Sequence, residues 1–400
     1  MLIRPFFMSR YHSYIASAGS IIQTYDGTGP LLFHLKKFFA ASKKFGSRDR
    51  KSISHLCYTY FRTAHAVSMK NTEEAILAGL FLCEQESNEM LAALRPDLND
   101  NISLSKNEKL EILQIDSAGL FPSYASLSDF IDKEKFCLSL LQQPGLYLRV
   151  RPGKHQRVLN LLETAGLAHE WIGKDCLRLK NSTSIDELFV LNKDVVVQDY
   201  NSQKVLHYLD ENQAVAFNGQ RVSAWDCCAA SGGKSVLLFD ILKGNVNITV
   251  SDIRTSILQN LAQRLRQAGI NINRSFAADL ALAEVELPED EFLVILCDAP
   301  CTGSGTWSRT PEQLYYFKEK TIKDFAIRQQ QIVANVTKKL KPGGLFFYIT
   351  CSVFRQENEE IVSYLQDELS LKLLQQEYLK GYEISADTMF VAVFTKPLLP

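Results

Sequence analysis

Apolar runs alternate with helical segments through the second half of the chain, and this alternation restricts the fold more than any other sequence feature. The runs read as strands and fall at residues 222–226, 246–251, 270–276, 292–297 and 344–350. Helical periodicity fills three of the intervals between them, at 235–243, 255–268 and 325–340. Strands that alternate with helices form a parallel, doubly wound sheet. We therefore predict an α/β domain over residues 206–400.

Two shorter regions precede this domain. Residues 1–115 show apolar positions at helical spacing, and Ser47 or Asp49 is a candidate cap for a helix that begins there. Pro and Gly punctuate residues 116–205, where residues 147–150 read as a strand. The sequence thus predicts an all-helical domain and a small α/β module ahead of the larger α/β domain.

Composition narrows the class of protein. The chain of 400 residues is long enough for two or three domains, and its apolar share of 46% is ordinary for globular proteins. It contains no apolar run of about 18 residues or more, so we expect no membrane span. Its nine cysteines are odd in number and scattered, which favours reduced thiols in the cytoplasm, and we expect a monomer. No Cys-x-x-Cys pair occurs, so we predict no metal site.

Charge is unevenly distributed, although the net charge is only −1. Residues 1–70 hold eleven Lys/Arg and two Asp/Glu, a balance of +9, whereas residues 71–144 hold five and thirteen, a balance of −8. Seven basic residues fall close together in the first region, at Lys36, Lys37, Lys43, Lys44, Arg48, Arg50 and Lys51. Such a basic face suits a polyanion such as RNA, and an ordinary solvated helix surface is the alternative.

A glycine-rich turn follows the first strand of the α/β domain. Its residues are Cys228, Ala229, Ala230, Ser231, Gly232, Gly233 and Lys234. Small residues here let a nucleotide-like ligand approach the backbone closely, although a merely structural turn is the alternative. The ending Gly-Lys-Ser imitates a phosphate-binding P-loop, but Cys228 stands where that motif needs a glycine. We therefore exclude a nucleoside triphosphatase.

Acidic residues follow the next two predicted strands. Asp252 ends the second strand, where a carboxylate can accept hydrogen bonds from ribose hydroxyls. Asp279 follows the third strand and could accept one from an adenine amino group. Either residue alone could be a helix cap. Together with the glycine-rich turn, they indicate an adenosyl ligand without phosphates, and S-adenosylmethionine fits that description.

Two thiols complete the pattern. Asp298 ends the fourth strand, Cys301 follows it, and Cys351 follows the fifth strand. A single cysteine at a strand end is usually an inert small residue, but two at neighbouring strand ends can face one cleft. A thiolate that adds to carbon 6 of a pyrimidine makes carbon 5 nucleophilic enough to take a methyl group, while a carboxyl group at ring nitrogen 3 balances the electron flow. The second thiol could then help to release the product.

These motifs resemble the Nop/Sun-type RNA (cytosine-5) methyltransferases, most closely the bacterial Sun/Fmu (RsmB-like) ribosomal RNA enzymes. The matching stretches are 197–203, 228–234, 298–303, 350–353 and 357–359. Residues 1–115 are a looser match to the NusB-like domain of those enzymes. The resemblance implies a Rossmann-like, S-adenosylmethionine-dependent catalytic domain over residues 206–400 and RNA-binding roles for residues 1–115 and 116–205.

The resemblance also implies roles for single residues. Cys351 would be the nucleophile, Cys301 would assist release of the methylated RNA, and Asp298 would touch both cofactor and base. The turn 228–234, with Asp252, Asp279 and Asp298, would line the S-adenosylmethionine site. Ser231 stands where the family usually has proline, which predicts a looser cofactor turn.

Other functions stay open at this point. The RNA could be transfer RNA instead of ribosomal RNA. A DNA cytosine-5 methyltransferase is the competing enzyme, and in that case Cys301 would be the attacking thiol. A non-catalytic RNA-binding assembly factor is the alternative without chemistry.

Overall fold

The computed structural model describes residues 5–67, 71–181, 183–217 and 219–398. Two compact units make up the chain. Unit 1 comprises Met1–Leu127, Asp132–Gln143 and Thr306–Glu319, and unit 2 comprises Ser128–Ile131, Pro144–Gly305 and Lys320–Pro400. The division into three consecutive domains therefore stays a prediction. Among the described residues, no helix has both the length and the apolar character that a membrane span requires.

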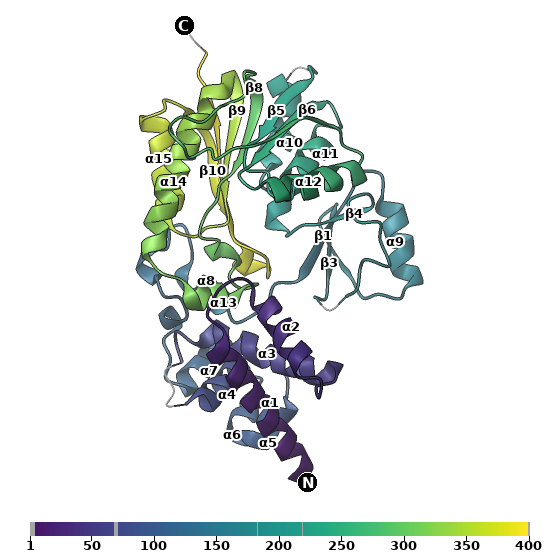
Figure 1. Ribbon diagram of the computed structural model, residues 1–400, viewed down its shortest axis with the longest axis vertical. Coiled ribbons are helices and arrows are strands. Elements are labelled where there is room, and N and C mark those ends of the chain that lie inside the picture. The colour runs from purple at the N-terminus through teal and green to yellow at the C-terminus, as the bar shows by residue number, and fades with distance from the viewer. Residues whose placement is uncertain (1–4, 68–70, 182, 218, 399–400) are drawn as a thin grey trace. The chain divides into compact units, whose positions relative to one another are not determined.

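Unit 1 is built from helices (Figure 1). They are α1 (Pro5–Thr24), α2 (Leu31–Ala41), α3 (Ser47–Thr63), α4 (Thr72–Cys83), α5 (Glu89–Leu94), α6 (Pro96–Asn99), α7 (Lys106–Ile112), α8 (Lys133–Ser139) and α13 (Pro311–Tyr316). Helix α3 begins where the sequence indicates, but neither predicted cap is right. Gly46 is the N-cap residue, and Asp49 in the first turn accepts the Gly46 backbone N–H at 2.8 Å.

Helix α13 packs into unit 1 although it follows α8 by more than a hundred and fifty residues. The rings of Tyr25 and Tyr316 lie 5.5 Å apart, and those of Phe61 and Tyr315 lie 5.4 Å apart. Gly27 adopts a φ of +81°, and a Cβ atom there would lie 2.6 Å from the Tyr316 ring. The loop after α1 thus needs glycine both for its conformation and for contact with α13.

Unit 2 contains a small antiparallel sheet in the order β2-β3-β1-β4. Its strands are β1 (Leu146–Val150), β2 (Glu170–Ile172), β3 (Cys176–Leu179) and β4 (Val195–Val197). Helix α9 (His155–Thr164) buries Val158 and Leu162 in one apolar cluster with Leu148 and Val150 of β1. This is the small α/β module that the sequence predicts ahead of the larger domain.

A seven-stranded sheet forms the centre of unit 2, in the order β10-β11-β9-β8-β5-β6-β7. Its strands are β5 (Val222–Asp226), β6 (Val246–Asp252), β7 (Ile272–Ala277), β8 (Phe292–Asp298), β9 (Leu340–Thr350), β10 (Lys372–Leu379) and β11 (Met389–Thr395). The first five match the predicted strands and pair in parallel. The last two pair antiparallel and were not foreseen. The predicted α/β fold class is confirmed.

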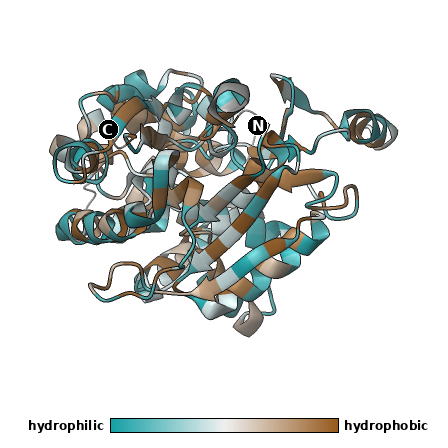
Figure 2. Ribbon diagram, turned by 90° about the horizontal axis from the view of Figure 1, so that it is seen from above, coloured by the Kyte–Doolittle hydropathy of each residue, from teal (hydrophilic) through white to brown (hydrophobic). Residues whose placement is uncertain are grey.

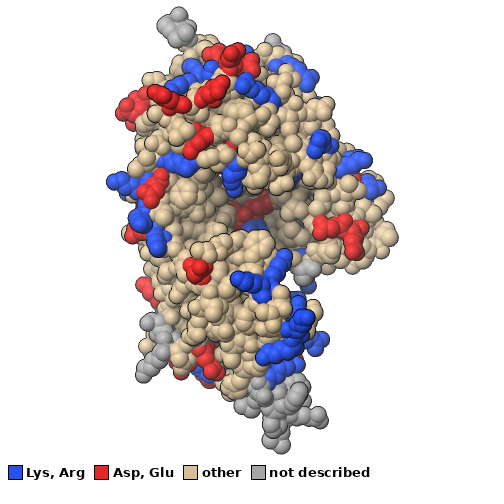
Figure 3. Space-filling model, viewed as in Figure 1, with Lys and Arg blue, Asp and Glu red and all other residues tan. Residues whose placement is uncertain are grey.

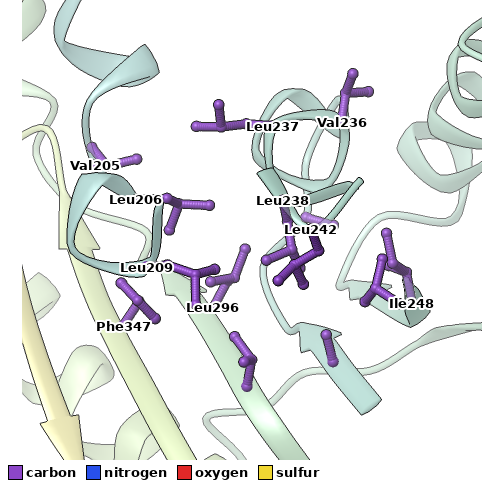
Figure 4. Close-up of a cluster of buried hydrophobic side chains, with 14 of the residues drawn as sticks. Val205, Leu206, Leu209, Val236, Leu237, Leu238, Leu242, Ile248, Leu296 and Phe347 are labelled. Atoms are coloured by element: carbon purple, nitrogen blue, oxygen red, sulfur yellow. The ribbon is translucent and has the colours of Figure 1, made fainter. Parts of the chain in front are cut away.

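Helices cover both faces of this sheet. Its strands are rich in apolar residues (Figure 2). Leu296 of β8 and Phe347 of β9 face the cluster formed with α10 (His207–Phe217), α11 (Gly233–Ile241) and α12 (Thr255–Gln267) (Figure 4). Ile295 and Phe346 face the cluster formed with α14 (Lys320–Val336) and α15 (Glu359–Asp367). Successive side chains of a strand point to opposite faces, so each strand contributes to both cores.

A buried ion cluster links the small sheet to α11. Asp240 of α11 accepts hydrogen bonds from Arg149 Nη1 at 2.6 Å and from Arg151 Nη2 at 2.8 Å and Nε at 3.0 Å. All three side chains are less than 10% exposed. The two guanidinium groups approach closely because one carboxylate lies between them.

We predict that Asp240→Ala lowers the free energy of unfolding by about 3–5 kcal/mol, since it leaves two buried cations without their anion. Urea unfolding followed by circular dichroism measures the change. The control is Glu170→Ala, which breaks an exposed pair with Arg178 and should cost less than about 1 kcal/mol. Equal effects of the two substitutions would contradict the assigned role of Asp240.

Candidate functional site

The residues that the sequence singles out meet at one edge of the large sheet. Strands β5, β6, β8 and β9 run parallel, so their carboxyl ends lie together. Asp252 ends β6, Asp298 ends β8, and Cys351 directly follows β9. Ligands of open α/β sheets bind at such an edge, next to the point where the strand order reverses. Here that reversal lies between β5 and β8.

The glycine-rich turn connects β5 to α11 along this edge. Ala229 N–H donates to the Ser251 carbonyl at 2.9 Å, which ties the turn to β6. Gly232 adopts a φ of +81°, and a Cβ atom there would meet the Leu261 side chain at 3.2 Å. Ser231 accepts hydrogen bonds from Arg264 Nη1 through Oγ at 2.9 Å and through its carbonyl at 3.2 Å. The hydrogen bonds from Arg264 therefore hold the turn at Ser231, the position where the sequence predicts a looser cofactor turn.

A cavity of about 420 Å³ opens beside the turn, within unit 2. Of the predicted cofactor residues, its wall includes Cys228, Ala230, Asp252, Asp279 and Asp298. The wall does not include Ala229, Ser231, Gly232, Gly233 or Lys234, which shape the turn behind it. Its volume is in the range of small-molecule sites.

Two carboxylates in the cavity wall, those of Asp252 and Asp279, each pair with an arginine that the sequence did not single out. Asp252 accepts hydrogen bonds from the Ala230 backbone N–H at 3.1 Å and from Arg254 Nε at 3.2 Å. Asp279 accepts one from Arg328 Nη2 at 3.0 Å. Each carboxylate has more acceptor sites than these donors occupy, so each can still accept hydrogen bonds from a ligand.

Lys234 and Asp298 form an ion pair next to the cavity. Lys234 Nζ donates to Asp298 Oδ2 at 2.6 Å, and the two side chains are 12% and 29% exposed. Burial alone would lower the pKa of Lys234, but the carboxylate of Asp298 raises it, and the pKa lies above its ordinary value. Lys234 is therefore a cation at neutral pH, and it fixes the Asp298 carboxylate at the cavity wall.

The two predicted thiols lie against each other. Cys301 Sγ and Cys351 Sγ are 3.4 Å apart, and both cysteines are free. The hydrogen bond to Cys351, together with burial, raises the pKa of Cys301 well above its ordinary value. The raised pKa favours the thiol form of Cys301, and the geometry allows either sulfur to donate the hydrogen bond.

A buried carboxylate joins the two turns that carry these thiols. Glu357 Oε1 accepts the backbone N–H of Thr302 at 2.9 Å and Gln329 Nε2 at 3.0 Å. Its Oε2 accepts the hydroxyls of Thr302, at 2.6 Å, and of Ser352. Thr302 follows Cys301 and Ser352 follows Cys351, so one side chain holds both turns. Glu357 falls within a stretch that matches the family motif, but the sequence alone indicates no role for it.

Gly305 fixes the end of the turn after Cys301. Its N–H donates to the Cys351 carbonyl at 2.8 Å, and its carbonyl accepts the Thr388 N–H at 2.9 Å. A Cβ atom on Gly305 would lie 2.0 Å from the Thr388 carbonyl oxygen. The backbones of three segments can meet here only around a residue without a side chain.

The fold and this edge define a Rossmann-like α/β domain. Residues 216–396 match the model of the family described as "16S rRNA methyltransferase RsmB/F". This region of the chain is similar to that family, in agreement with the resemblance of the sequence motifs.

Curated relatives agree with this assignment. The chain is 28% identical over 247 residues to "Probable ribosomal RNA small subunit methyltransferase B" of Bacillus subtilis (strain 168), covering 61% of the chain and 54% of that protein. It is 32% identical over 235 residues to "Ribosomal RNA small subunit methyltransferase B" of Yersinia pestis bv. Antiqua (strain Angola), covering 56% and 52%. The chain thus spans about half the length of these relatives.

Solved structures share the fold. "Crystal Structure of PH0851" matches with a TM-score of 0.68 at 19% identity, covering 99% of this chain and 100% of that chain. "The crystal structure of NSun6 from Pyrococcus horikoshii with SFG" matches with a TM-score of 0.57 at 16% identity, covering 69% and 97%. At these identities the likeness concerns the fold. The NusB-like character of the helical region stays a prediction.

We predict that Glu357→Gln lowers the free energy of unfolding by about 1–3 kcal/mol, because glutamine offers one acceptor oxygen to four donors. Burial raises the pKa of Glu357 above its ordinary value. The stability that the wild-type carboxyl contributes is therefore complete below that ordinary value and is lost as pH rises through the raised pKa. The difference in unfolding free energy between wild type and variant should therefore narrow as pH rises from below the ordinary glutamate pKa through the raised pKa, as urea unfolding at a series of pH values measures.

The control for this prediction is Glu360→Gln. Glu360 is exposed and lies 3.5 Å from Arg355 in an exposed pair. Its substitution should change the unfolding free energy by less than about 0.5 kcal/mol across the same pH series. A gap between wild type and Glu357→Gln that widens with pH would contradict the burial argument.

Proposed function

We propose that the chain is an RNA (cytosine-5)-methyltransferase that acts on ribosomal RNA with S-adenosylmethionine as methyl donor. The single observation that carries this proposal is the juxtaposition of Cys301 and Cys351 at 3.4 Å, beside an acid-lined cavity at the carboxyl edge of the sheet. The family of residues 216–396 and the names of the relatives support ribosomal RNA as the substrate class.

The chemistry of the cavity fits the proposed cofactor. S-adenosylmethionine supplies a methyl group on a positively charged sulfur and carries no phosphate. Asp252 is suited to the ribose hydroxyls and Asp279 to the adenine amino group, because both keep free acceptor sites. Asp298, in the cavity wall, would add negative charge near the cationic end of such a ligand.

Cys351 would make the covalent bond to the base. Its thiolate attacks carbon 6 of the cytosine, and the electron pair of the 5,6 double bond moves toward carbon 5, which then takes the methyl group. Lys234, a cation with Asp298 as its partner, provides the electropositive setting that a thiolate needs. Asp298 would have to carry a proton at this step, which it would donate toward ring nitrogen 3 to offset the negative charge that the attack places on the ring.

Cys301 would act in the second half of the reaction. A base, for which solvent water is available, takes the proton from carbon 5, and the electron pair of that bond restores the 5,6 double bond as the carbon–sulfur bond to Cys351 breaks and the thiolate leaves. The raised pKa of Cys301, caused by its contact with Cys351 and by burial, favours the thiol form at neutral pH. Cys301 would assist this step by stabilising the departing sulfur as a hydrogen-bond donor.

We predict that Cys351→Ala abolishes the covalent RNA adduct and that Cys301→Ala lets the adduct accumulate. Denaturing gels of the protein incubated with ribosomal RNA and S-adenosylmethionine measure the adduct. Cys83→Ala, which removes a free cysteine of α4, should behave as wild type. An adduct that survives Cys351→Ala but not Cys301→Ala would reverse the two roles. It would favour the DNA cytosine-5 methyltransferase alternative, in which Cys301 is the attacking thiol.

The substrate is tested by transfer of a labelled methyl group. Ribosomal RNA from cells that lack this gene should accept label, and bisulfite sequencing should find 5-methylcytosine at a discrete position. Transfer RNA and DNA serve as competing acceptors. RNA binding without any transfer would favour the non-catalytic alternative.

The basic face of unit 1 would contact the RNA backbone. Lys36, Lys37, Lys43, Lys44, Arg48, Arg50 and Lys51 are all exposed. Basic side chains gather over α2 and the start of α3 (Figure 3). Lysine and arginine on a solvent-exposed face bind phosphates and release counterions.

We predict that replacing Lys36, Lys37, Lys43 and Lys44 with glutamine weakens RNA binding and flattens its salt dependence. The slope of log K against log salt should fall by about 0.7 per lost phosphate contact to single-stranded RNA. Filter binding at several salt concentrations measures it. Lys372→Gln with Lys380→Gln, at two exposed lysines at and just after β10, is the control. An unchanged slope would count against this face.

A further inference from the structure

Three cysteines without a proposed role in bond making or breaking lie together at the sheet edge, and two of them, Cys227 and Cys228, also line the proposed cofactor cavity. Cys227 follows β5, Cys228 is in the glycine-rich turn, and Cys297 lies in β8. Their three sulfur atoms are all within 4.8 Å of one another. All three thiols are free of disulfide bonds.

Strand register brings these residues together. Asp226 of β5 pairs with Leu296 of β8 in parallel, and the Cys227 N–H donates to the Leu296 carbonyl at 2.9 Å. Cys227 and Cys297 are thus neighbours on adjacent strands, one residue further along. Cys228 comes within reach because the chain turns away from the strand there.

The surroundings make this a protected sulfur cluster with one open side. Cys227 and Cys297 are fully buried, in an apolar cluster that includes Trp225, Ile295 and Tyr348. Cys227 and Cys228 also form part of the cavity wall, which gives an entry path. Among the described residues, no histidine or carboxylate joins this group of sulfurs.

A set of three sulfurs selects among metal ions. Thiolates prefer soft ions such as Cu(I), Zn²⁺ and iron in clusters. Structural zinc sites and iron–sulfur clusters usually use four protein ligands, whereas Cu(I) is well satisfied by three thiolates. An ion about 2.3 Å from each of three sulfurs needs them about 4 Å apart, a spacing that small side-chain rotations provide here.

We propose that Cys227, Cys228 and Cys297 bind a soft, thiophilic metal ion, with Cu(I) as the ion that fits. Each thiol that binds the ion releases its proton to solvent, and no electron is transferred. Cys227 and Cys228 also border the proposed cofactor cavity, so the metal is titrated without S-adenosylmethionine, and the readout does not depend on methyl transfer.

The Cys301 and Cys351 pair is a second dithiol that could take copper, so the test begins by removing it. The full chain carrying Cys301→Ser and Cys351→Ser is reduced and titrated under anaerobic conditions with Cu(I) held by bicinchoninate. We expect this background to withdraw one Cu(I) per chain. Adding Cys297→Val to this background should lower its affinity for Cu(I) by at least about tenfold, a loss of the size that removal of metal contacts causes.

Controls separate this outcome from loss of structure. Cys137→Ala, which removes a buried cysteine of α8, should retain the copper. Cys297→Ser keeps the size of the side chain and carries the test if the valine variant does not fold, as thermal unfolding reports. X-ray absorption of the loaded background should show three sulfur neighbours around copper.

Three results would overturn the proposal. The first is equal copper retention by the background and by both Cys297 variants. The second is copper that binds the wild type but not the background, which would assign it to Cys301 and Cys351. The third is a copper ion with fewer than three sulfur neighbours, which would leave the cluster as buried apolar side chains.

Discussion

The carboxylate of Glu357 holds together the part of the molecule on which the candidate chemistry depends. It takes four hydrogen bonds, two from Thr302 and one each from Ser352 and Gln329, in a fully buried position. Burial of a carboxylate without hydrogen-bond donors would cost several kcal/mol of folding free energy. Here each of the two Glu357 oxygens accepts two hydrogen bonds. The turns after β8 and β9 come from separate parts of the sequence, and this side chain fixes their spacing. The short sulfur–sulfur distance is a result of that spacing.

The ion pair of Lys234 and Asp298 is a second, partly buried charged group at this edge of the sheet. The Glu357 carboxyl group, ionised or protonated, is enclosed by neutral side chains and backbone. Asp298, in contrast, pairs with the cation of Lys234 and borders the cavity. The same residue type therefore serves for structure in one place and is available to a ligand in the other. Burial and partners, more than residue identity, decide which carboxylate could take part in a reaction.

The sequence predicts the meeting of Cys301 and Cys351 because both follow parallel strands, and parallel strands end at one edge. Arg328 and Gln329 could not be placed that way, since they lie on α14 and reach the edge through helix packing. Strand β10 alternates half-buried and exposed positions at the sheet margin, which weakens its sequence pattern. The sequence did not predict the cluster of Cys227, Cys228 and Cys297 for a related reason. The spacing of cysteines along the chain does not show which residues the register of adjacent strands brings together.

The passage of the chain between its two units has a consequence for synthesis. Residues 306–319 belong to unit 1, yet they emerge from the ribosome after β1 to β8 of unit 2 and before β9. The core formed by Phe61, Tyr315 and Tyr316 is therefore incomplete while most of the other unit is already translated. Unit 1 cannot complete its core until residues 306–319 have been synthesised, and by then most of unit 2 has been translated. The two units therefore complete their folding over the same period of synthesis. A protein cut at residue 143 would leave the aromatic side chains of α13 without the helices that bury them.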